Sequence, residues 1–422
     1  MNQEHHFRWK DYLSATIIVA ALGYFVDIYD LILFSIVRKQ SLIGIGVPID
    51  KIQEIGLVLL NVQMIGMLTG GIFWGILGDK KGRLSVLFGS ILLYSLANIA
   101  NGLVQNTMQY GILRFIAGFG LAGELGAGIT LVSEMLPKEK RGYGTMLVAT
   151  IGVSGAVFAG FVGIFFETVV NGWRICYYIG GGLGLTLLFM RIGLFESGMY
   201  DAIKHHEVKK GDFSMLFTNW VRFKKYLKCI LIGLPIWYTI GILITFSPEL
   251  AKAIGVVGEI KAAKAIMFFY AGVTVGDFLS GAMSQWLKSR KKVIVIFLLL
   301  LVVTLIPFFN ANGITAATYY WIIVAVGIGA GFWAVIVTIA AESFGTNLRS
   351  TVTTTVPNFI RGALFFISLL FTYLQVLLKS SLGKEQALIW SAIITGCIMI
   401  IIPLLTVFTM KETYGKELDY TE

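Results

Sequence analysis

Twelve apolar stretches, each long enough to cross a lipid bilayer, constrain this chain of 422 residues more than any other feature. A helix of about 20 apolar residues crosses the hydrocarbon core and satisfies its own backbone hydrogen bonds without water. Charged or polar breaks separate the stretches, which we place at 15–37, 55–78, 84–104, 109–134, 143–166, 173–196, 226–248, 262–286, 293–310, 317–341, 350–378 and 387–410. The sequence therefore predicts an all-α membrane protein with twelve transmembrane helices.

The composition argues against a water-soluble fold and against enzyme chemistry. Hydrophobic residues make up 56% of the chain and charged residues only 14%, whereas about a quarter of the residues in soluble domains are charged. The three cysteines lie far apart and the four histidines form two polar pairs, so we predict no disulfide, no metal site and no cofactor. The sequence contains no phosphate-binding loop and no metalloprotease or serine-hydrolase motif, so we expect neither a primary pump nor an enzyme.

The distribution of positive charge predicts the orientation in the membrane. Most of the 34 Lys and Arg residues fall in the two tails and in the alternate loops on their side, for example at 80–83, 138–141 and 288–292. Because positively charged loops remain in the cytoplasm, we predict that both termini are cytoplasmic. We expect a multi-pass protein of a cell membrane, with a bacterial inner membrane as the first expectation. The formal net charge of +10 then reflects this topology, and the expected surroundings are a lipid bilayer rather than nucleic acid.

A polar stretch and an internal repeat divide the chain into halves. Residues 197–225 separate six apolar stretches from six, and the Glu134…Arg141 pair after the fourth stretch recurs at the same spacing as Glu342…Arg349 after the tenth. Repeats of this kind are typical of transporters whose halves are related by an axis along the membrane normal. We predict two six-helix bundles, residues 1–196 and 226–422, around a central cavity. A cytoplasmic linker, 197–225, joins them, and we expect a functional monomer.

The loop after the second stretch carries Gly75, Gly78, Asp79, Gly82 and Arg83. From the residues alone this is a short basic hairpin in which glycines let helices approach closely. The pattern resembles the loop motif of the major facilitator superfamily, which implies the twelve-helix fold and transport by alternating access.

This resemblance also implies a latch that closes the cytoplasmic side in the outward-open state. Asp79 and Arg83 match the family's loop motif, and Glu134 and Arg141 match a second motif after the fourth stretch. We extend the assignment to the second copy of the repeat. The predicted gating residues are Gly75, Asp79, Gly82, Arg83, Glu134, Arg141, Glu342 and Arg349.

Three acidic residues lie within the apolar stretches and are candidates for proton coupling. Asp27 and Asp30 are three residues apart in the first stretch, so they share a helix face. A charge at this depth is costly unless it faces a cavity or a partner. The segment resembles the first helix of proton-coupled sugar, phosphate and metabolite symporters, which implies that Asp27 or Asp30 takes the coupling proton. Glu124 matches an acid of such symporters, although a protonated core carboxyl would also explain it.

Two arginines within the stretches each need an anion, because guanidinium stays charged. Arg114 lies at a depth similar to that of Asp30, and we expect the two to pair, either as a permanent brace or as a pair that opens during transport. For Arg361 we expect either Asp277 or a substrate anion. Aromatic side chains beside Pro235 are candidate cavity walls, although packing explains them equally well. The predicted substrate-binding residues are Arg114, Arg361, Asn358, Trp237, Tyr238 and Asp277.

Together these features predict a secondary transporter in which two bundles rock around a midplane site. The expected partners are a small organic anion and H⁺, carried together by symport. The alternatives left open are a sugar or polyol transporter, a drug-type efflux antiporter and, from other classes, a membrane-embedded enzyme or a sensor.

Overall fold

The computed structural model describes residues 15–136, 141–190 and 213–416. Within these ranges, eight side chains are also outside the described part of the structure: those of Ala15, Thr16, Asp50, Gln53, Arg83, Glu134, Met135 and Arg141. Across the described ranges the regular structure is helical, and the only β-type pairing is one isolated bridge between Val257 and Thr315. The predicted all-α fold is confirmed.

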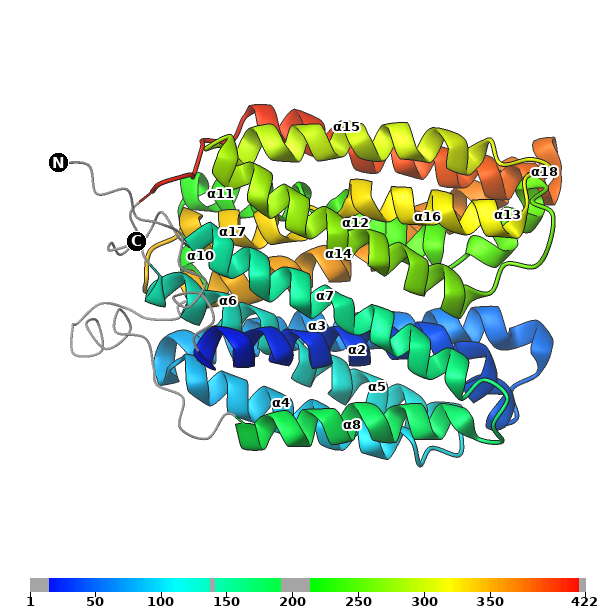
Figure 1. The fold of residues 1–422 in the computed structure, drawn as a ribbon, viewed down its shortest axis with the longest axis horizontal. Helices are drawn as coiled ribbons and strands as arrows, with labels where there is room; N and C mark the ends of the chain where they lie inside the picture. Colours follow the sequence, from blue (N-terminus) through cyan, green and yellow to red (C-terminus); the bar gives the residue numbers. More distant parts are fainter. Residues whose placement is uncertain (1–14, 137–140, 191–212, 417–422) are drawn as a thin grey trace.

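The first half of the chain forms one bundle of helices, coloured blue to green in Figure 1. Its helices are α2 (Ala15–Gly44), α3 (Ile52–Lys81), α4 (Arg83–Asn101), α5 (Thr107–Leu121), α6 (Glu124–Met135), α7 (Arg141–Phe165) and α8 (Gly172–Met190), with a single 3-10 turn, η1 (Ile49–Lys51), before α3. The predicted fourth stretch is thus two helices, α5 and α6, because the chain breaks at Ala122 and Gly123.

The second half forms the other bundle, coloured green to red in Figure 1. Its helices are α10 (Met215–Thr218), α11 (Trp220–Leu231), α12 (Leu234–Tyr238), α13 (Ser247–Ile254), α14 (Ala262–Trp286), α15 (Arg290–Phe309), α16 (Ala316–Ala330), α17 (Trp333–Ser343) and α18 (Arg349–Phe408), with a π-helical turn, η2 (Thr239–Ile244), after α12. Helix α18 is kinked within its length, since it contains a residue with non-helical backbone angles, Gly383, at φ 77°. Two membrane spans meet there.

The described helices account for the twelve predicted spans. Ten segments are long and apolar enough to cross a membrane; α8 supplies the sixth span, and α18 contains two of the twelve. The predicted limits of the linker stay a prediction, because residues 191–212 lie outside the described ranges. Helix α11 begins at Trp220, inside the stretch predicted as linker.

The two bundles lie side by side and pack mainly through α7 against α14 and α3 against α18. Glycines make the close approach possible. A Cβ atom added to Gly75 of α3 would lie 3.0 Å from Thr351 Cα, and one added to Gly126 of α6 would overlap the backbone of Thr354. Small residues at such crossings let the two helix backbones contact each other directly, as is usual where helices associate in lipid.

Several charged side chains are buried inside the protein, while many large apolar side chains lie on its surface. Asp27, Asp30, Arg114 and Arg361 are each at most 1% exposed, whereas large apolar side chains such as Trp286 are mostly exposed. This is the reverse of a soluble domain, and it places the costly charges where cavities or partners can compensate them.

Asp79 closes one end of the interface between the bundles. This is the end where α2 begins and α18 ends, called the termini end below (Figure 1). Asp79 Oδ1 accepts a hydrogen bond from the Ser350 backbone N–H at 3.2 Å, and Oδ2 accepts from the Thr351 N–H at 2.8 Å and from Thr351 Oγ1 at 2.6 Å. A carboxylate of the first bundle therefore caps the N-terminus of α18 in the second, where the helix dipole favours negative charge.

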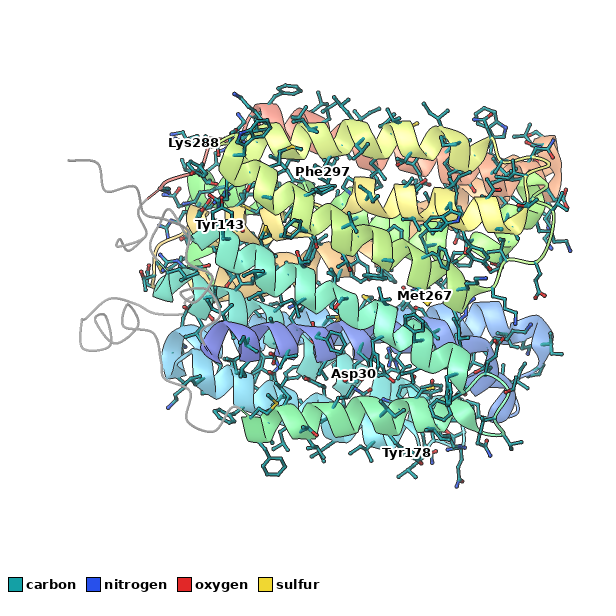
Figure 2. The ribbon with its side chains drawn as sticks, viewed as in Figure 1. Asp30, Tyr143, Tyr178, Met267, Lys288 and Phe297 are labelled. Carbon is teal, nitrogen blue, oxygen red and sulfur yellow. The ribbon has the colours of Figure 1, made fainter. Side chains whose placement is uncertain are left out.

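The opposite end is closed by weaker contacts. Lys261 Nζ lies 3.2 Å from Glu167 Oε1, and their side chains are 54% and 37% exposed. Such solvent-exposed ion pairs contribute little to stability. Deeper in, Gly160 of α7 packs against Met267 of α14, which Figure 2 places between the bundles. At the same end, Arg38 of α2 lies 6.0 Å from the centre of the Phe246 ring of the second bundle. Both ends are thus closed, and the hydrogen-bonded carboxylate cap lies at the termini end.

We predict that Asp79→Ala opens the termini end. Loss of this cap should cost about 1–2 kcal/mol, which corresponds to a roughly 5- to 30-fold change in the ratio of closed to open molecules. Spin labels at Lys81 and Lys288, one on each bundle (Figure 2 shows Lys288), should then report a longer distance. The experiment needs a Cys397→Ser background, since Cys397 is exposed. Lys261→Ala, at the opposite end, is the control and should leave this distance unchanged; equal effects of both changes would contradict the assignment.

Candidate functional site

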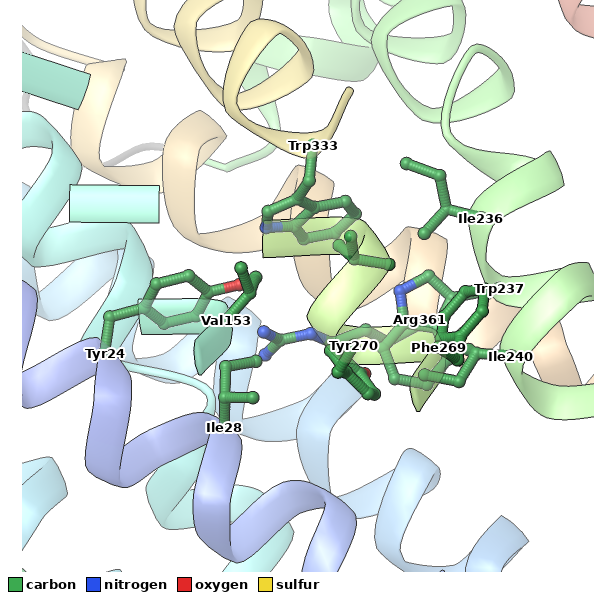
Figure 3. A pocket seen from close by; sticks show the side chains of 11 residues that line it. Tyr24, Ile28, Val153, Ile236, Trp237, Ile240, Phe269, Tyr270, Trp333 and Arg361 are labelled. Carbon is green, nitrogen blue, oxygen red and sulfur yellow. The ribbon is translucent and has the colours of Figure 1, made fainter. Parts of the chain in front are cut away.

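A closed cavity lies between the bundles and is lined mostly by apolar and aromatic side chains (Figure 3). Its volume is only about 20 Å³, room for about one water molecule, so in this occluded state it is much smaller than a ligand-filled small-molecule site. A neighbouring cavity, also of about 20 Å³, shares the side chains of Trp237 and Ile240. The lining residues are Tyr24, Ile28, Val153, Ile236, Trp237, Ile240, Phe269, Tyr270, Val273, Trp333 and Arg361.

Arg361 carries the charge among these described lining residues. In Figure 3 its guanidinium group points from α18 toward Tyr24 and Ile28 on α2. Its Nη2 lies 3.6 Å from Asp27 Oδ2, and both side chains are at most 1% exposed. The guanidinium carbon also lies 5.7 Å from the centre of the Trp333 ring. A buried ion pair thus joins the two bundles at the wall of the cavity.

Asn358 positions this arginine. Its side-chain Oδ1 accepts a hydrogen bond from Arg361 Nη1 at 3.3 Å. Its Nδ2 donates to the Thr354 carbonyl at 2.7 Å and, across the interface, to the Ala122 carbonyl at 2.8 Å. The Ala122 carbonyl can accept this bond because the chain breaks there, between α5 and α6. The predicted binding residue Asn358 is therefore a link between the broken helix and the arginine.

The expected pairing of Arg361 with Asp277 is wrong, since the ion pair is made with Asp27. Asp277 Oδ1 instead accepts a hydrogen bond from the Ala334 backbone N–H at 3.1 Å. The tenth span breaks before Trp333, so α17 begins inside the protein with N–H groups that its own helix cannot pair. Asp277 serves as their buried cap and is not among the residues that line the cavity.

The expected pair between Arg114 and Asp30 is also not formed. In the described part of the chain no ion pair within 4.0 Å joins them; Arg114 Nη2 donates to Gln63 Oε1, and its guanidinium lies 4.9 Å from the Phe34 ring centre. Asp30 lies inside the first bundle (Figure 2), where a Cβ atom on Gly180 would overlap its carboxylate. Neither residue lines the cavity, so the prediction that Arg114 contacts substrate is not supported by its position.

The neighbouring aromatic residues Trp237 and Tyr238 have different places. Trp237 lines both cavities, as predicted for a wall. Tyr238 does not line them: it points to the second span of α18, where its hydroxyl donates to the Ala392 carbonyl at 2.6 Å. Consecutive helical residues lie about 100° apart around the axis, so only one of the two can face the cavity.

Sequence analysis missed several cavity residues, among them Tyr24, Tyr270 and Trp333. A signal for Tyr24 was present, because it precedes Asp27 by three residues and therefore shares its helix face. Glu124, the third acidic candidate, begins α6 directly after the break and is 1% exposed.

The predicted gating residues divide between the two bundles. Gly75 and Asp79 contact α18 across the interface, and Gly82, at φ 97°, supplies the positive φ needed between α3 and α4. Glu342 Oε1 lies 2.9 Å from Arg290 Nη2, within the second bundle. The last predicted members are Arg349, which is buried as the first residue of α18, and Arg83, Glu134 and Arg141, whose side chains lie outside the described residues.

These features, two six-helix bundles around a closed interface cavity, define a secondary transporter rather than an enzyme. The sequence profile of the Major Facilitator Superfamily matches residues 12–368. The chain therefore belongs to this superfamily and is an integral, multi-pass membrane protein.

Curated relatives resemble parts of the chain. It is 26% identical over 222 residues to a putative niacin/nicotinamide transporter, NiaP, of Bacillus subtilis, covering 53% of each chain. It is 27% identical over 244 residues to a low affinity inorganic phosphate transporter of Lotus japonicus (49% of this chain, 46% of the other). It is 29% identical over 194 residues to a benzoate transport protein of Acinetobacter baylyi (44% and 39%). The chain spans about half the length of these relatives.

Solved structures confirm the fold over nearly the whole chain. The proton:xylose symporter XylE, bound to 6-bromo-6-deoxy-D-glucose, superposes with a TM-score of 0.78 at 16% identity, covering 97% of this chain and 98% of the other. The transporter FucP in the outward conformation superposes with a TM-score of 0.70 at 15% identity, covering 94% and 99%. At these identities the likeness shows the fold alone.

We predict that Asp27 and Arg361 are energetically coupled. Removing one partner of a buried pair leaves the other charge uncompensated, so Asp27→Asn and Arg361→Gln should each lower the free energy of unfolding by about 3–5 kcal/mol. The double variant should lose less than the sum by more than about 1 kcal/mol. Denaturant unfolding of the detergent-purified protein measures these values.

The matched control is Asp277→Asn combined with Arg361→Gln. Because Asp277 caps α17 instead of facing Arg361, these two changes should be additive within about 0.5 kcal/mol. Stronger coupling to Asp277 than to Asp27 would show that the pairing described above is incorrect.

Proposed function

We propose that this protein is a proton-coupled symporter of small organic anions, with aromatic monocarboxylates as the favoured class. The observation that carries the proposal is the ion pair between Arg361 and Asp27, 3.6 Å apart at the wall of the closed cavity. Arg361 is the anion-binding group, and Asp27 is the anion that occupies it when no substrate is bound.

Proton and substrate are coupled by exchange at Arg361. Protonation of Asp27 removes its negative charge and leaves the guanidinium without a counter-ion, which is unfavourable for a buried cation. A substrate carboxylate that enters the cavity restores the pair, and guanidinium can bind a carboxylate with two hydrogen bonds. Binding of the anion and binding of the proton therefore favour each other.

The cavity walls support an aromatic substrate. Trp237, Phe269, Tyr270 and Trp333 line the same cavity as Arg361, and aromatic rings prefer edge-to-face or offset packing against other rings. The names of two relatives point the same way, since niacin and benzoate are both aromatic carboxylates. An inorganic anion, as named for the phosphate transporter relative, would leave these apolar walls without a partner.

Charge balance supports symport of a proton with a monocarboxylate. One negative and one positive charge cross together, so the loaded protein moves no net charge through the low-dielectric interior. Asp30 and Glu124 remain candidates for relaying the proton. The cavity is complete within one chain, so we propose the monomer as the functional unit.

We further propose that the termini end faces the cytoplasm and that the transport direction is uptake. The positively charged loops of the sequence support this orientation. In the closed state the opposite end is held by the exposed Lys261–Glu167 pair, so it is the end that opens at lower cost to admit substrate from outside. The Asp79 cap has to release before substrate leaves on the other side.

We predict a linked pH dependence of anion binding. Titration calorimetry of the purified protein with benzoate and nicotinate between pH 5.5 and 8 should show tighter binding at low pH. Where Asp27 ionises, the Kd should rise by about tenfold per pH unit, since one proton is taken up with each anion. Arg361→Gln should abolish binding, and Asp27→Asn should bind with an affinity that does not vary with pH.

Two outcomes would overturn parts of the proposal. If Asp27→Asn keeps the pH dependence and Asp30→Asn or Glu124→Gln loses it, the coupling acid is a different one. If xylose or glucose binds and neither carboxylate does, the organic-anion assignment is wrong. Phe269→Leu, which keeps an apolar wall without the ring, is the matched test of the aromatic preference and should weaken benzoate more than acetate.

A further inference from the structure

A second and larger pocket lies at the termini end, within the second bundle. Its volume is about 460 Å³, and it is formed by α11, the end of α17 and the segment that follows α18. Figure 1 shows α11 at this end of the molecule. It shares no lining residue with the transport cavity.

The lining of this pocket is strongly basic. Lys224, Lys225 and Lys228 come from α11, and Lys411 and Lys416 come from the segment after α18. They are brought together from two distant parts of the sequence, so the cluster is a product of the fold. Several ammonium groups on one concave surface create a positive potential that attracts anions.

The carboxylate in the lining, that of Glu412, offsets only one of the five lysine charges, and its oxygens are occupied by other donors. Glu412 Oε2 accepts a hydrogen bond from Ser289 Oγ at 2.5 Å, and Oε1 accepts from the backbone N–H of Arg290 at 3.0 Å. Burial alone would raise the pKa of Glu412, but these hydrogen bonds and those from the Thr413 and Tyr414 N–H groups hold it below its ordinary value. The carboxylate is committed to the first turn of α15.

Lys224 and Lys228 retain donors for a ligand. Lys228 Nζ donates one hydrogen bond to the Thr409 carbonyl at 2.7 Å, and an ammonium group has three donors. Lys224 Nζ lies 4.9 Å from the centre of the Trp220 ring, a contact that places its charge without using its hydrogen atoms. The ammonium groups of lysines are compact charges on flexible side chains. They can therefore approach a tetrahedral phosphate group, whose oxygens point in several directions.

The surroundings of the pocket place it at the surface of the bilayer. Trp220 and Val221, at the start of α11, are 65% and 74% exposed beside the lysines. Tryptophan is enriched where hydrocarbon meets head groups. A lysine pocket bordered by exposed apolar side chains therefore lies at the depth of the lipid phosphates.

We propose that this pocket binds a phosphate group, supplied either by the head group of an anionic phospholipid or by a soluble phosphate ester. A bound phosphate joins α11 to the segment after α18, and so ties the first and last spans of the second bundle together at their ends.

Native mass spectrometry of the detergent-purified full chain tests this proposal with three probes. These are phosphatidylglycerol, phosphatidylcholine with the same acyl chains, and glycerol 3-phosphate. The test variant is Lys224→Gln/Lys228→Gln/Lys411→Gln. Each lysine near a membrane surface contributes about 1 kcal/mol to the binding of anionic lipid, so the triple change should weaken phosphatidylglycerol binding by roughly 100-fold.

The matched control is Lys81→Gln/Lys288→Gln/Lys292→Gln, which removes three exposed lysines at the same end but outside the pocket. This variant should bind like the unchanged protein, and the arginine version of the pocket triple should retain binding. Selective loss with phosphatidylglycerol only assigns the site to lipid; the same loss with glycerol 3-phosphate assigns it to phosphate from either source. Binding of neither probe, equal binding of phosphatidylcholine, or equal losses in both glutamine triples would overturn the proposal.

Discussion

The buried pair of Asp27 and Arg361 is the interaction on which the rest of this structure depends. Either charge alone would be strongly disfavoured between the bundles, because a charge taken out of water needs a close partner of opposite sign. The pair is stable only while the two bundles hold α2 and α18 together. Separation of the bundles therefore breaks the pair and requires another way to compensate each charge. In the symport proposed above, a proton on Asp27 and an anion on Arg361 would supply this compensation.

The two ends of the interface differ in how they are held, and the difference follows from backbone chemistry. At the termini end, Asp79 satisfies N–H groups that α18 cannot pair itself. The threonine pairs Thr130–Thr353 at 2.5 Å and Thr145–Thr338 at 2.7 Å add buried hydrogen bonds across the same interface. At the opposite end the Lys261–Glu167 ion pair is exposed to water, which competes for both partners. A closed molecule built in this way opens more readily at the opposite end.

Hydropathy alone predicted the spans, because a helix in lipid has to be about 20 apolar residues long. The repeat and the glycine-rich loop predicted the superfamily, and depth along the helix predicted which charges matter. The sequence could not predict which carboxylate pairs with Arg361. Asp27 and Asp277 both lie deep enough in their spans to reach it, and the choice between them depends on helix rotation and on breaks in the chain. The tenth span breaks before Trp333, and this break commits Asp277 to capping α17. Hydropathy carries no signal for such a break, since both halves are equally apolar.

The two copies of the internal repeat share a fold but not a function, and the reason lies in what each polar side chain meets. Gly75 and Gly281 lie near the ends of the second and the eighth predicted stretch, and each packs against the opposite bundle, on Thr351 and Met146 respectively.

The polar residues that follow these glycines make different contacts in the two copies. Asp79 reaches across to cap α18, whereas Arg290, in the second copy, turns inward to Glu342 at 2.9 Å. The segment after α18 then adds Thr413, which donates to Glu342 at 2.9 Å. One copy therefore seals the interface and has to break in each transport cycle, while the other stabilises its own bundle and can stay intact. A matching cap from the second copy would add to the cost of opening, so this division of roles lowers the number of polar contacts that have to break when the bundles separate at the termini end.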